Sequence, residues 1–236
     1  MMTALLFALL PAAGNFAGGL IAEVLPASSA WRNWTLHAAV GVVLAVVSVE
    51  IIPEALTTLA GWQIAVAFVA GGLFYLAIDA IVASRARANR SKMWMIYIAV
   101  AADLLGDGLM IGTSSTLTAD LALVLAIGQV LADVPEGAAS ILTFRANDIN
   151  RRRRLLLSAS FAIPALAGAA LSYALLRDRP ESWQLMGLVG TAGLFSVAVI
   201  EDMISDAHEA EPDNRRSTVA LLAGFAAFVL VSAGLG

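Results

Sequence analysis

The sequence predicts an all-α integral membrane protein, and three observations support that prediction. Hydrophobic residues make up 60% of the 236-residue chain and charged residues only 14%. The mean hydropathy of +0.84 lies far from the balance of a water-soluble domain. Apolar runs of about 20 residues, the length of a helix that crosses a bilayer, recur along the whole sequence. Residues 1–236 are therefore predicted to form a single transmembrane domain.

Turn residues and charges divide the chain into eight predicted membrane helices. The first is interpreted as a membrane helix rather than a signal peptide, because no basic residue precedes it and its apolar character continues to Leu25. The later connections are short, and the two longer ones, residues 84–92 and 145–154, are basic. In order, the predicted helices span residues 4–25, 35–58, 62–84, 93–114, 118–145, 154–176, 183–208 and 217–235.

The distribution of Lys and Arg predicts the orientation of these helices. Twelve of the fourteen basic residues fall on one side of the membrane, and only Arg177 and Arg179 fall on the other. Because cytoplasmic loops are enriched in Lys and Arg, both termini are predicted to lie outside the cytoplasm. The chain has no cysteine, which excludes disulfides and thiolate metal ligands. Together with the compact loops, this favours the plasma (inner) membrane of a bacterium or archaeon.

Apart from Glu23, Asp79 and Asp120, which lie near helix ends, nine acidic side chains lie within the apolar parts of the predicted membrane helices, and no Lys or Arg lies among them. A carboxylate at membrane depth is costly unless it has a partner, so it indicates a functional site. We expect the compensating positive charge to come from outside the chain, as protons or metal cations. The nine residues are Glu50, Glu54, Asp103, Asp107, Asp133, Glu136, Glu201, Asp202 and Asp206.

Four of these acids form two pairs near the middle of the membrane. Asp103 and Asp107 are four residues apart, and Asp133 and Glu136 are three apart, so each pair shares one helix face. Glycine or proline accompanies each pair and can free backbone carbonyls to face a cation. If the two helices face each other, the four carboxyls form a hard-oxygen cage suited to a divalent cation. The alternative for any one of them is a protonated acid hydrogen-bonded to a neighbouring helix.

A second acidic pattern occurs twice and suggests an internal repeat. Glu50-Ile-Ile-Pro-Glu54-Ala in the second predicted helix resembles Asp202-Met-Ile-Ser-Asp206-Ala in the seventh. Helices 1–3 and 6–8 would then be copies of opposite topology around helices 4 and 5, a 3+2+3 arrangement. Glu50 and Glu54 would lie in the outer half of the membrane, and Asp202 and Asp206 in the inner half. Interfacial helix ends, where acids are inexpensive, are the alternative for Glu54 and Asp206.

Two histidines and several glycines are given simpler interpretations. His208 follows the seventh helix and is a candidate exit ligand, although the acids after it are interpreted as a solvated loop. His37 is interpreted as interfacial. Gly14, Gly18 and the Gly71-Gly72 pair are expected at close helix contacts.

These motifs resemble those of the ZIP (ZRT/IRT-like) family of divalent-metal transporters, over essentially the whole chain. Asp103-Leu-Leu-Gly-Asp107-Gly is similar to the family's helix-4 motif, His-Asn-x-Pro-Glu/Asp-Gly. Ala132-Asp133-Val-Pro-Glu136-Gly is similar to its helix-5 motif, His-Asp/Glu-x-Pro-Glu-Gly. The resemblance, to a divergent prokaryotic-type member, implies eight helices, termini outside the cytoplasm and a metal site between helices 4 and 5.

The resemblance also assigns roles at that metal site. Asp107, Asp133 and Glu136 match metal ligands, and Asp103 replaces a ligand histidine. Three departures from the family motifs remove a second metal position and every central imidazole. This chain has Leu104 where the family has asparagine, Ala132 where it often has histidine, and Ile163 where many bacterial members have glutamate. We expect one all-oxygen site, which favours Mn²⁺, Fe²⁺ or another hard ion over the zinc that the family implies.

The sequence therefore predicts a transporter that moves a divalent metal cation into the cytoplasm, with the metal as substrate and no prosthetic cofactor. Glu50 and Glu54 would attract the ion, and Glu201, Asp202, Asp206 and His208 would line its exit. Its partners would be divalent metal ions, the lipid bilayer and a second copy in a homodimer, with no nucleic acid. An enzyme is not expected, because no Gly-x-Gly-Asp protease motif is present and no Arg or His accompanies the central acidic pairs to hold a lipid phosphate. A metal-binding membrane sensor or a non-transporting relative is the alternative.

Overall fold

The computed structural model describes residues 1–24, 28–86 and 92–235, and this part of the chain is helical with no strand. The prediction of an all-α protein is therefore confirmed. Its elements are α1 (Met2–Val24), α2 (Ser29–Ala45), η1 (Val46–Ile51), α3 (Ile52–Leu56), α4 (Gly61–Ala86), α5 (Lys92–Leu117), α6 (Ala119–Ala146), α7 (Arg151–Ser160), α8 (Ala162–Leu176), α9 (Glu181–Ala198), η2 (Val199–Ile204), α10 (Ser205–Ala210) and α11 (Arg215–Leu235). The segments η1 and η2 are π-helical and continue the α-helices on either side of them.

Within the described residues, seven helical stretches are long and apolar enough to cross a membrane. Each matches one of the predicted helices, which is consistent with a multi-pass membrane protein. The α5 helix has 26 residues but is not among the seven. It corresponds to the predicted helix 93–114 and carries Asp103 and Asp107.

Polar capping residues set several helix ends outside the apolar runs. The second membrane helix was predicted to begin at residue 35, but α2 begins at Ser29. The Ser28 hydroxyl accepts a hydrogen bond from the Trp31 backbone N–H at 3.2 Å, which satisfies one of the free donors of the first turn. Thr118 and Asn150 cap α6 and α7 in the same way. A search for apolar runs cannot find such ends, because the first turn extends into polar sequence.

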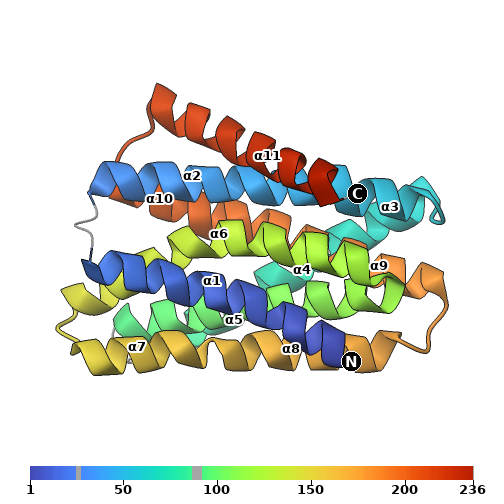
Figure 1. Ribbon diagram of the computed structural model, residues 1–236, viewed down its shortest axis with the longest axis horizontal. Helices are drawn as coiled ribbons and strands as arrows, with labels where there is room; N and C mark the ends of the chain where they lie inside the picture. Colours follow the sequence, from blue (N-terminus) through green and yellow to red (C-terminus); the bar gives the residue numbers. More distant parts are fainter. Residues whose placement is uncertain (25–27, 87–91, 236) are drawn as a thin grey trace.

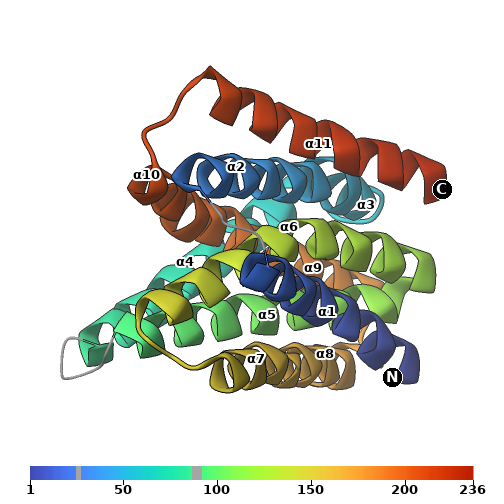
Figure 2. The same cartoon turned by 60° about the vertical axis from the view of Figure 1, so that its left-hand side comes forward.

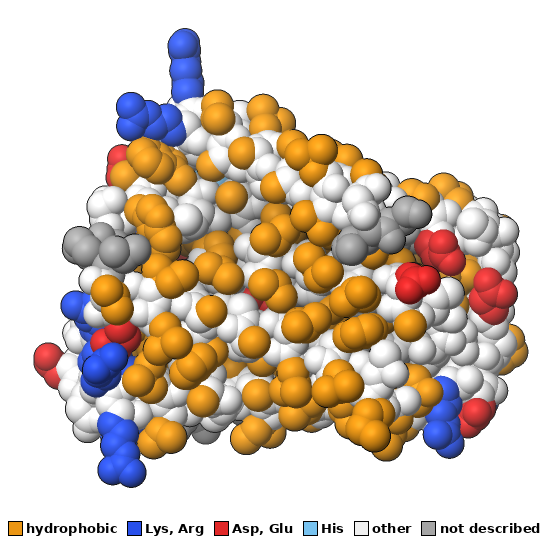
Figure 3. Space-filling model, viewed as in Figure 1, with side chains coloured by type: hydrophobic (Ala, Val, Ile, Leu, Met, Phe, Trp, Pro, Cys, Tyr) orange, Lys and Arg blue, Asp and Glu red, His pale blue; other side chains and the backbone are white. Residues whose placement is uncertain are grey.

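The helices run side by side along the long axis of the molecule, and both termini lie at the same end (Figure 1). In the space-filling view, most Lys and Arg side chains gather at the opposite end, with a smaller basic group near the termini (Figure 3). We call these the basic end and the terminus end. Apolar side chains cover the surface between them, as expected for a protein surrounded by lipid.

Four helix pairs make the closest contacts: α1 with α6, α5 with α8, α2 with α11 and α4 with α9. Each pair approaches through glycines, and a Cβ on Gly18 would lie only 1.8 Å from the Val134 carbonyl oxygen. Gly71 would meet the Gly190 carbonyl oxygen at the same distance. The predicted role of Gly18 and Gly71 at close helix contacts is therefore confirmed. The α11 helix lies at the edge of the bundle, along α2 (Figures 1 and 2).

These pairs have an internal correspondence. If the first three membrane helices are exchanged with the last three, and α5 with α6, the α1–α6 pair becomes α8–α5 and the α2–α11 pair becomes α9–α4. The contact of α2 with α6 likewise becomes that of α9 with α5. The second and seventh predicted helices, which carry the repeated acidic pattern, also share an irregularity. Each contains a π-helical segment that includes acidic residues: Glu50 lies in η1, and Glu201 and Asp202 lie in η2. Such π-helical turns occur frequently at functional sites.

Candidate metal centre

Three of the four predicted cage residues converge where α5 meets α6. One carboxyl oxygen from each of Asp103, Asp107 and Asp133 lies within 4.8 Å of the other two. Asp107 and Asp133 are almost completely buried, with 0% and 1% of their surface exposed. The structure thus brings together acids that come from two different helices.

Glu136 lies beside this cluster and lines the same cavity as Asp103. The Asn15 side-chain amide of α1 donates a hydrogen bond to Glu136 Oε2 at 3.3 Å. We call Asp103, Asp107, Asp133 and Glu136 the carboxyl cage.

Glycines beside the carboxyl groups allow this arrangement. Gly137 follows Glu136, and a Cβ there would lie 1.8 Å from the Asn15 carbonyl oxygen. The missing side chain lets α1 touch α6, and so brings the Asn15 amide to the cage. Gly108 follows Asp107 and allows the equivalent contact with Ala165 of α8, where a Cβ would lie 2.0 Å from the carbonyl oxygen. The glycines of both motifs therefore hold the flanking helices against the cage.

Gln129 is a further member of the site that the sequence interpretation missed, as is Asn15. It lies one turn before Asp133 on α6, and its Nε2 donates a hydrogen bond to Asp107 Oδ1. Both amides are buried, Gln129 at 2% and Asn15 at 0% exposure. An uncharged amide inside an apolar helix is the signal that identifies such residues, and a pattern of charges does not reveal it.

Four buried oxygens at the cage have no hydrogen-bond partner among the described residues. Buried polar atoms in proteins are almost always paired, so each such atom needs an explanation. Carboxylate and amide oxygens are the ligands that hard divalent cations prefer. A cation between α5 and α6 would satisfy these atoms together. They are Asn15 Oδ1, Asp107 Oδ2, Gln129 Oε1 and Asp133 Oδ2.

A cavity of about 660 Å³ leads from the cage to the basic end of the bundle. Asp103 and Glu136 line its inner part, and Asp202, Asp206 and Arg32 also line it. Asp107 and Asp133 lie behind this lining, and Asp107 is one helical turn, about 6 Å, further from the basic end than Asp103. The cage therefore has a cavity tier, Asp103 and Glu136, and a buried tier, Asp107 and Asp133.

The expectation that no basic side chain partners these acids is wrong for Asp206. Its Oδ2 lies 3.0 Å from an amino nitrogen of Arg32, which comes from the first turns of α2. The two residues are 174 positions apart in sequence, so only the packing of α2 against α10 brings them together. Asp206 is thus a helix-end acid with a partner that also lines the cavity.

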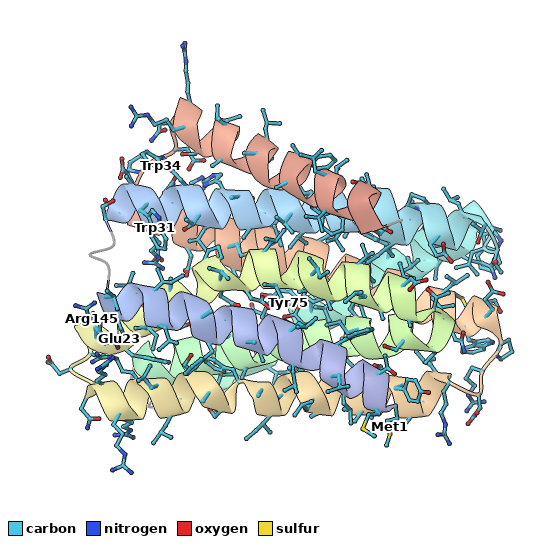
Figure 4. All side chains as sticks on the ribbon, viewed as in Figure 1. Met1, Glu23, Trp31, Trp34, Tyr75 and Arg145 are labelled. Carbon is cyan, nitrogen blue, oxygen red and sulfur yellow. The ribbon has the colours of Figure 1, made fainter. Side chains whose placement is uncertain are left out.

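The remaining residues predicted to line the exit differ from one another. Asp202 accepts a hydrogen bond from the Tyr75 hydroxyl of α4, a partner that the sequence did not indicate; Tyr75 is half-buried and lies midway between the two ends of the bundle (Figure 4). Glu201 is exposed and is not among the residues that line the cavity. His208 is not among the residues that line the cavity, and its Nε2 lies 2.7 Å from Asp213 Oδ2.

Two acids of the first repeat lie toward the terminus end. Glu50 accepts a hydrogen bond from the Ser232 hydroxyl of α11, and Glu54 lies in the short helix α3. Both are half-buried, and neither is among the described residues that line the cavity. The structure thus joins Asp202 and Asp206 to the cage but not Glu50 and Glu54.

The three residues that depart from the family motifs fall in different environments. Leu104 and Ala132 are buried at 0% and 2% exposure, where they extend the apolar core beside the cage. Ile163 is 69% exposed and lies just before Pro164, after the interruption of the helix at Phe161. Leu104 and Ala132 therefore lie next to the cage, whereas residue 163 lies on the surface of the bundle.

His37 was interpreted as interfacial, but it is buried at 5% exposure. Its Nε2 lies 3.3 Å from Asp213 Oδ1, so both histidines of the chain contact the same carboxyl group. Burial acts to raise the pKa of Asp213, but hydrogen bonds from His208 and Asn33 and the nearby imidazoles hold that pKa below its usual value. Asp213 is therefore an ionised carboxylate at neutral pH.

No protein-family model matches this chain, and no curated protein matches it.

Proposed function

We propose that this protein is a divalent metal cation transporter whose carboxyl cage binds the transported ion. The observation that carries the proposal is the convergence of Asp103, Asp107 and Asp133 within 4.8 Å, with unpaired oxygens on two of them. Buried carboxylates repel one another and favour their neutral forms unless a cation lies among them. A site of this kind destabilises the folded protein, so a purely structural role does not account for it.

The cavity supplies a route between the cage and the basic end. Cytoplasmic loops are enriched in Lys and Arg, so the basic end would face the cytoplasm, and both termini would lie outside it. The cavity would then be the path of release, with Asp202 and Asp206 along its wall. Metal would move into the cytoplasm across the plasma membrane.

The internal correspondence of the helix pairs supports the 3+2+3 arrangement of eight membrane helices. Exchanging helices 1–3 with helices 6–8 preserves the main contacts, as an inverted repeat requires. Transporters built from such repeats place their sites near the middle of the membrane, between the repeats. This architecture and the motifs at the cage support membership in the ZIP family.

The ligand chemistry favours a hard cation. Both histidines of the chain lie outside the cage, so its donors are carboxyl oxygens and the amides of Asn15 and Gln129. Oxygen ligands suit Mn²⁺ and Fe²⁺ better than Zn²⁺, which prefers nitrogen and sulfur donors. Zinc remains a substrate to test, because the family resemblance implies it.

The test is metal uptake into proteoliposomes, measured for Mn²⁺, Fe²⁺, Zn²⁺, Cd²⁺ and Mg²⁺. We expect uptake of Mn²⁺ or Fe²⁺ by the wild type and its loss in Asp107→Asn, because the variant removes one charge from the buried tier. Asp120→Asn is the matched control, since Asp120 is exposed at the start of α6. Binding of metal without any flux would contradict the proposal and favour a membrane metal sensor.

A further inference from the structure

We propose that His37, His208 and Asp213 form a second metal site, separate from the carboxyl cage and suited to Zn²⁺ or a similar borderline cation. One ligand atom from each residue lies within 4.8 Å of the other two. The site joins α2, α10 and the segment before α11 at the basic end. It does not depend on the proposed transport, because none of its residues belongs to the cage.

Both imidazoles present the same ring nitrogen to one carboxylate. His37 Nε2 lies 3.3 Å from Asp213 Oδ1, and His208 Nε2 lies 2.7 Å from Asp213 Oδ2. The ring centroids are 6.2 Å apart and the rings are tilted by 59°. The chain contains only two histidines, in different membrane helices, and folding brings both to this point.

The second ring nitrogen of His37 is held by the backbone. His37 Nδ1 lies 2.8 Å from the Asn33 carbonyl oxygen, and a carbonyl can only accept. Nδ1 therefore carries the proton, and in the neutral ring the Nε2 lone pair points at the Asp213 carboxylate. Metal-bound histidines are oriented in this way, with the other ring nitrogen donating to a carbonyl or carboxylate. Two acceptors at this distance need a cation or a proton between them.

Asn33 also fixes the carboxylate ligand. Its side chain is completely buried, and its Nδ2, which has two hydrogens to donate, lies 3.1 Å from Asp213 Oδ1 and 3.1 and 2.9 Å from the carbonyl oxygens of Ala207 and Glu211. Its own Oδ1 accepts from the Ser217 hydroxyl at 2.6 Å. One residue thus orients His37 through its backbone and Asp213 through its side chain, which is the support that a metal site requires.

The spacing fits a small cation after a modest contraction. Bonds of about 2.0–2.1 Å to a tetrahedral zinc ion place ligand atoms roughly 3.3 Å apart, so each ligand would move by about an ångström or less. Two imidazoles and one carboxylate are a donor set that zinc prefers, with one position open to water. His208 and Asp213 are exposed, so the ion can enter from the aqueous phase at the basic end.

The test is zinc X-ray absorption on the full-length protein carrying Asp133→Asn, which weakens the cage, with one equivalent of Zn²⁺. Imidazole produces outer-shell scattering that carboxylates do not, and any imidazole signal from this chain must come from His37 or His208. We expect two imidazoles on the metal. We also expect Zn²⁺ to bind about 100-fold more weakly in His37→Gln and in His208→Gln, because losing a ligand costs at least as much as losing a residue that only supports a ligand.

Glu209→Gln is the matched control, because Glu209 lies on α10 beside His208 but outside the cluster. Thermal unfolding without metal checks that every variant is folded. Zinc bound without imidazole, or binding unchanged in folded His208→Gln, would overturn the proposal and leave a protonated histidine–aspartate cluster. The cage proposal is tested separately, by counting the metal ions bound per protein in the wild type and in Asp133→Asn. Equal numbers in the two proteins would contradict the cage proposal without affecting the histidine site.

Discussion

The basic side and the terminus side of the bundle carry similar acidic patterns but differ in access to the cage. On the basic side, Asp202 and Asp206 line a cavity that reaches Asp103 and Glu136. On the terminus side, Glu50 is bonded to Ser232 of α11, and neither Glu50 nor Glu54 lines that cavity. If the halves are related by an inverted repeat, the structure is one of two states, the one open to the basic end. The similar acidic patterns therefore do not determine from which end of the bundle the cage is accessible.

The largest expected effect comes from the contact on which both halves depend, that of α1 with α6. A Cβ at Gly137 would lie 1.8 Å from the Asn15 carbonyl oxygen. Gly137→Ala must separate the two helices, and we expect it to destabilise the fold by about 3 kcal/mol or more. The melting temperature in detergent measures this. Gly61→Ala is the control, since no atom lies within 4 Å of a Cβ there. Equal melting temperatures for the two variants would show that the helices are not in close contact.

The next prediction compares the two halves directly by cysteine labelling. The chain has no cysteine, so a single introduced thiol can be followed without background. Thr143→Cys places the thiol in the cavity, and Ser232→Cys places it beside Glu50 on the other side. A membrane-impermeant maleimide at the basic end should modify residue 143 rapidly, whereas from the terminus end it should reach residue 232 slowly. Equal rates would mean that both halves are open and that the comparison is wrong.

The sequence predicted the helices and the acids better than it predicted their partners. The eight apolar runs and the four carboxyls of the cage were visible because hydropathy and charge are local properties. Arg32, Tyr75 and Asn15 were not visible, because they meet Asp206, Asp202 and Glu136 across sequence separations of more than 100 residues. The burial of His37 was missed for the same reason, since packing against the segment before α11 covers a residue that hydropathy places at the interface.

A smaller effect is expected from Gln129, which lies with Asp107 and Asp133 in the part of the cage away from the cavity. Its amide donates to Asp107 Oδ1, while its own Oε1 has no partner among the described residues. Gln129→Ala should weaken Mn²⁺ binding about tenfold, the lower end of the effect of losing a supporting partner. Isothermal titration calorimetry measures the change. Gln184→Ala, which removes a buried amide of α9 remote from the cage, should leave binding unaltered. Equal affinity in both variants would remove Gln129 from the site.

The smallest effect is expected at the mouth of the cavity. Arg32 and Asp206 form an ion pair at 3.0 Å, with 27% and 53% of their side chains exposed. Solvent screens such a pair, so Arg32→Gln should lower the free energy of unfolding by less than about 1 kcal/mol. Chemical denaturation tests this value, with Arg179→Gln at the terminus end as the control. A loss of several kcal/mol would show that the pair holds the helices together rather than lining an open mouth.

We propose that the carboxyl cage binds the ion that the protein moves. The most direct test of this proposal measures Mn²⁺ binding and initial Mn²⁺ uptake on the same preparation of Asp133→Asn, with the wild type and Asp120→Asn beside it. Asp133 is buried, and one of its oxygens has no partner among the described residues. We predict that Asp133→Asn loses binding and uptake together, while Asp120→Asn retains both. Uptake by Asp133→Asn at the wild-type rate would contradict the account, because the ion would then cross the membrane without the cage.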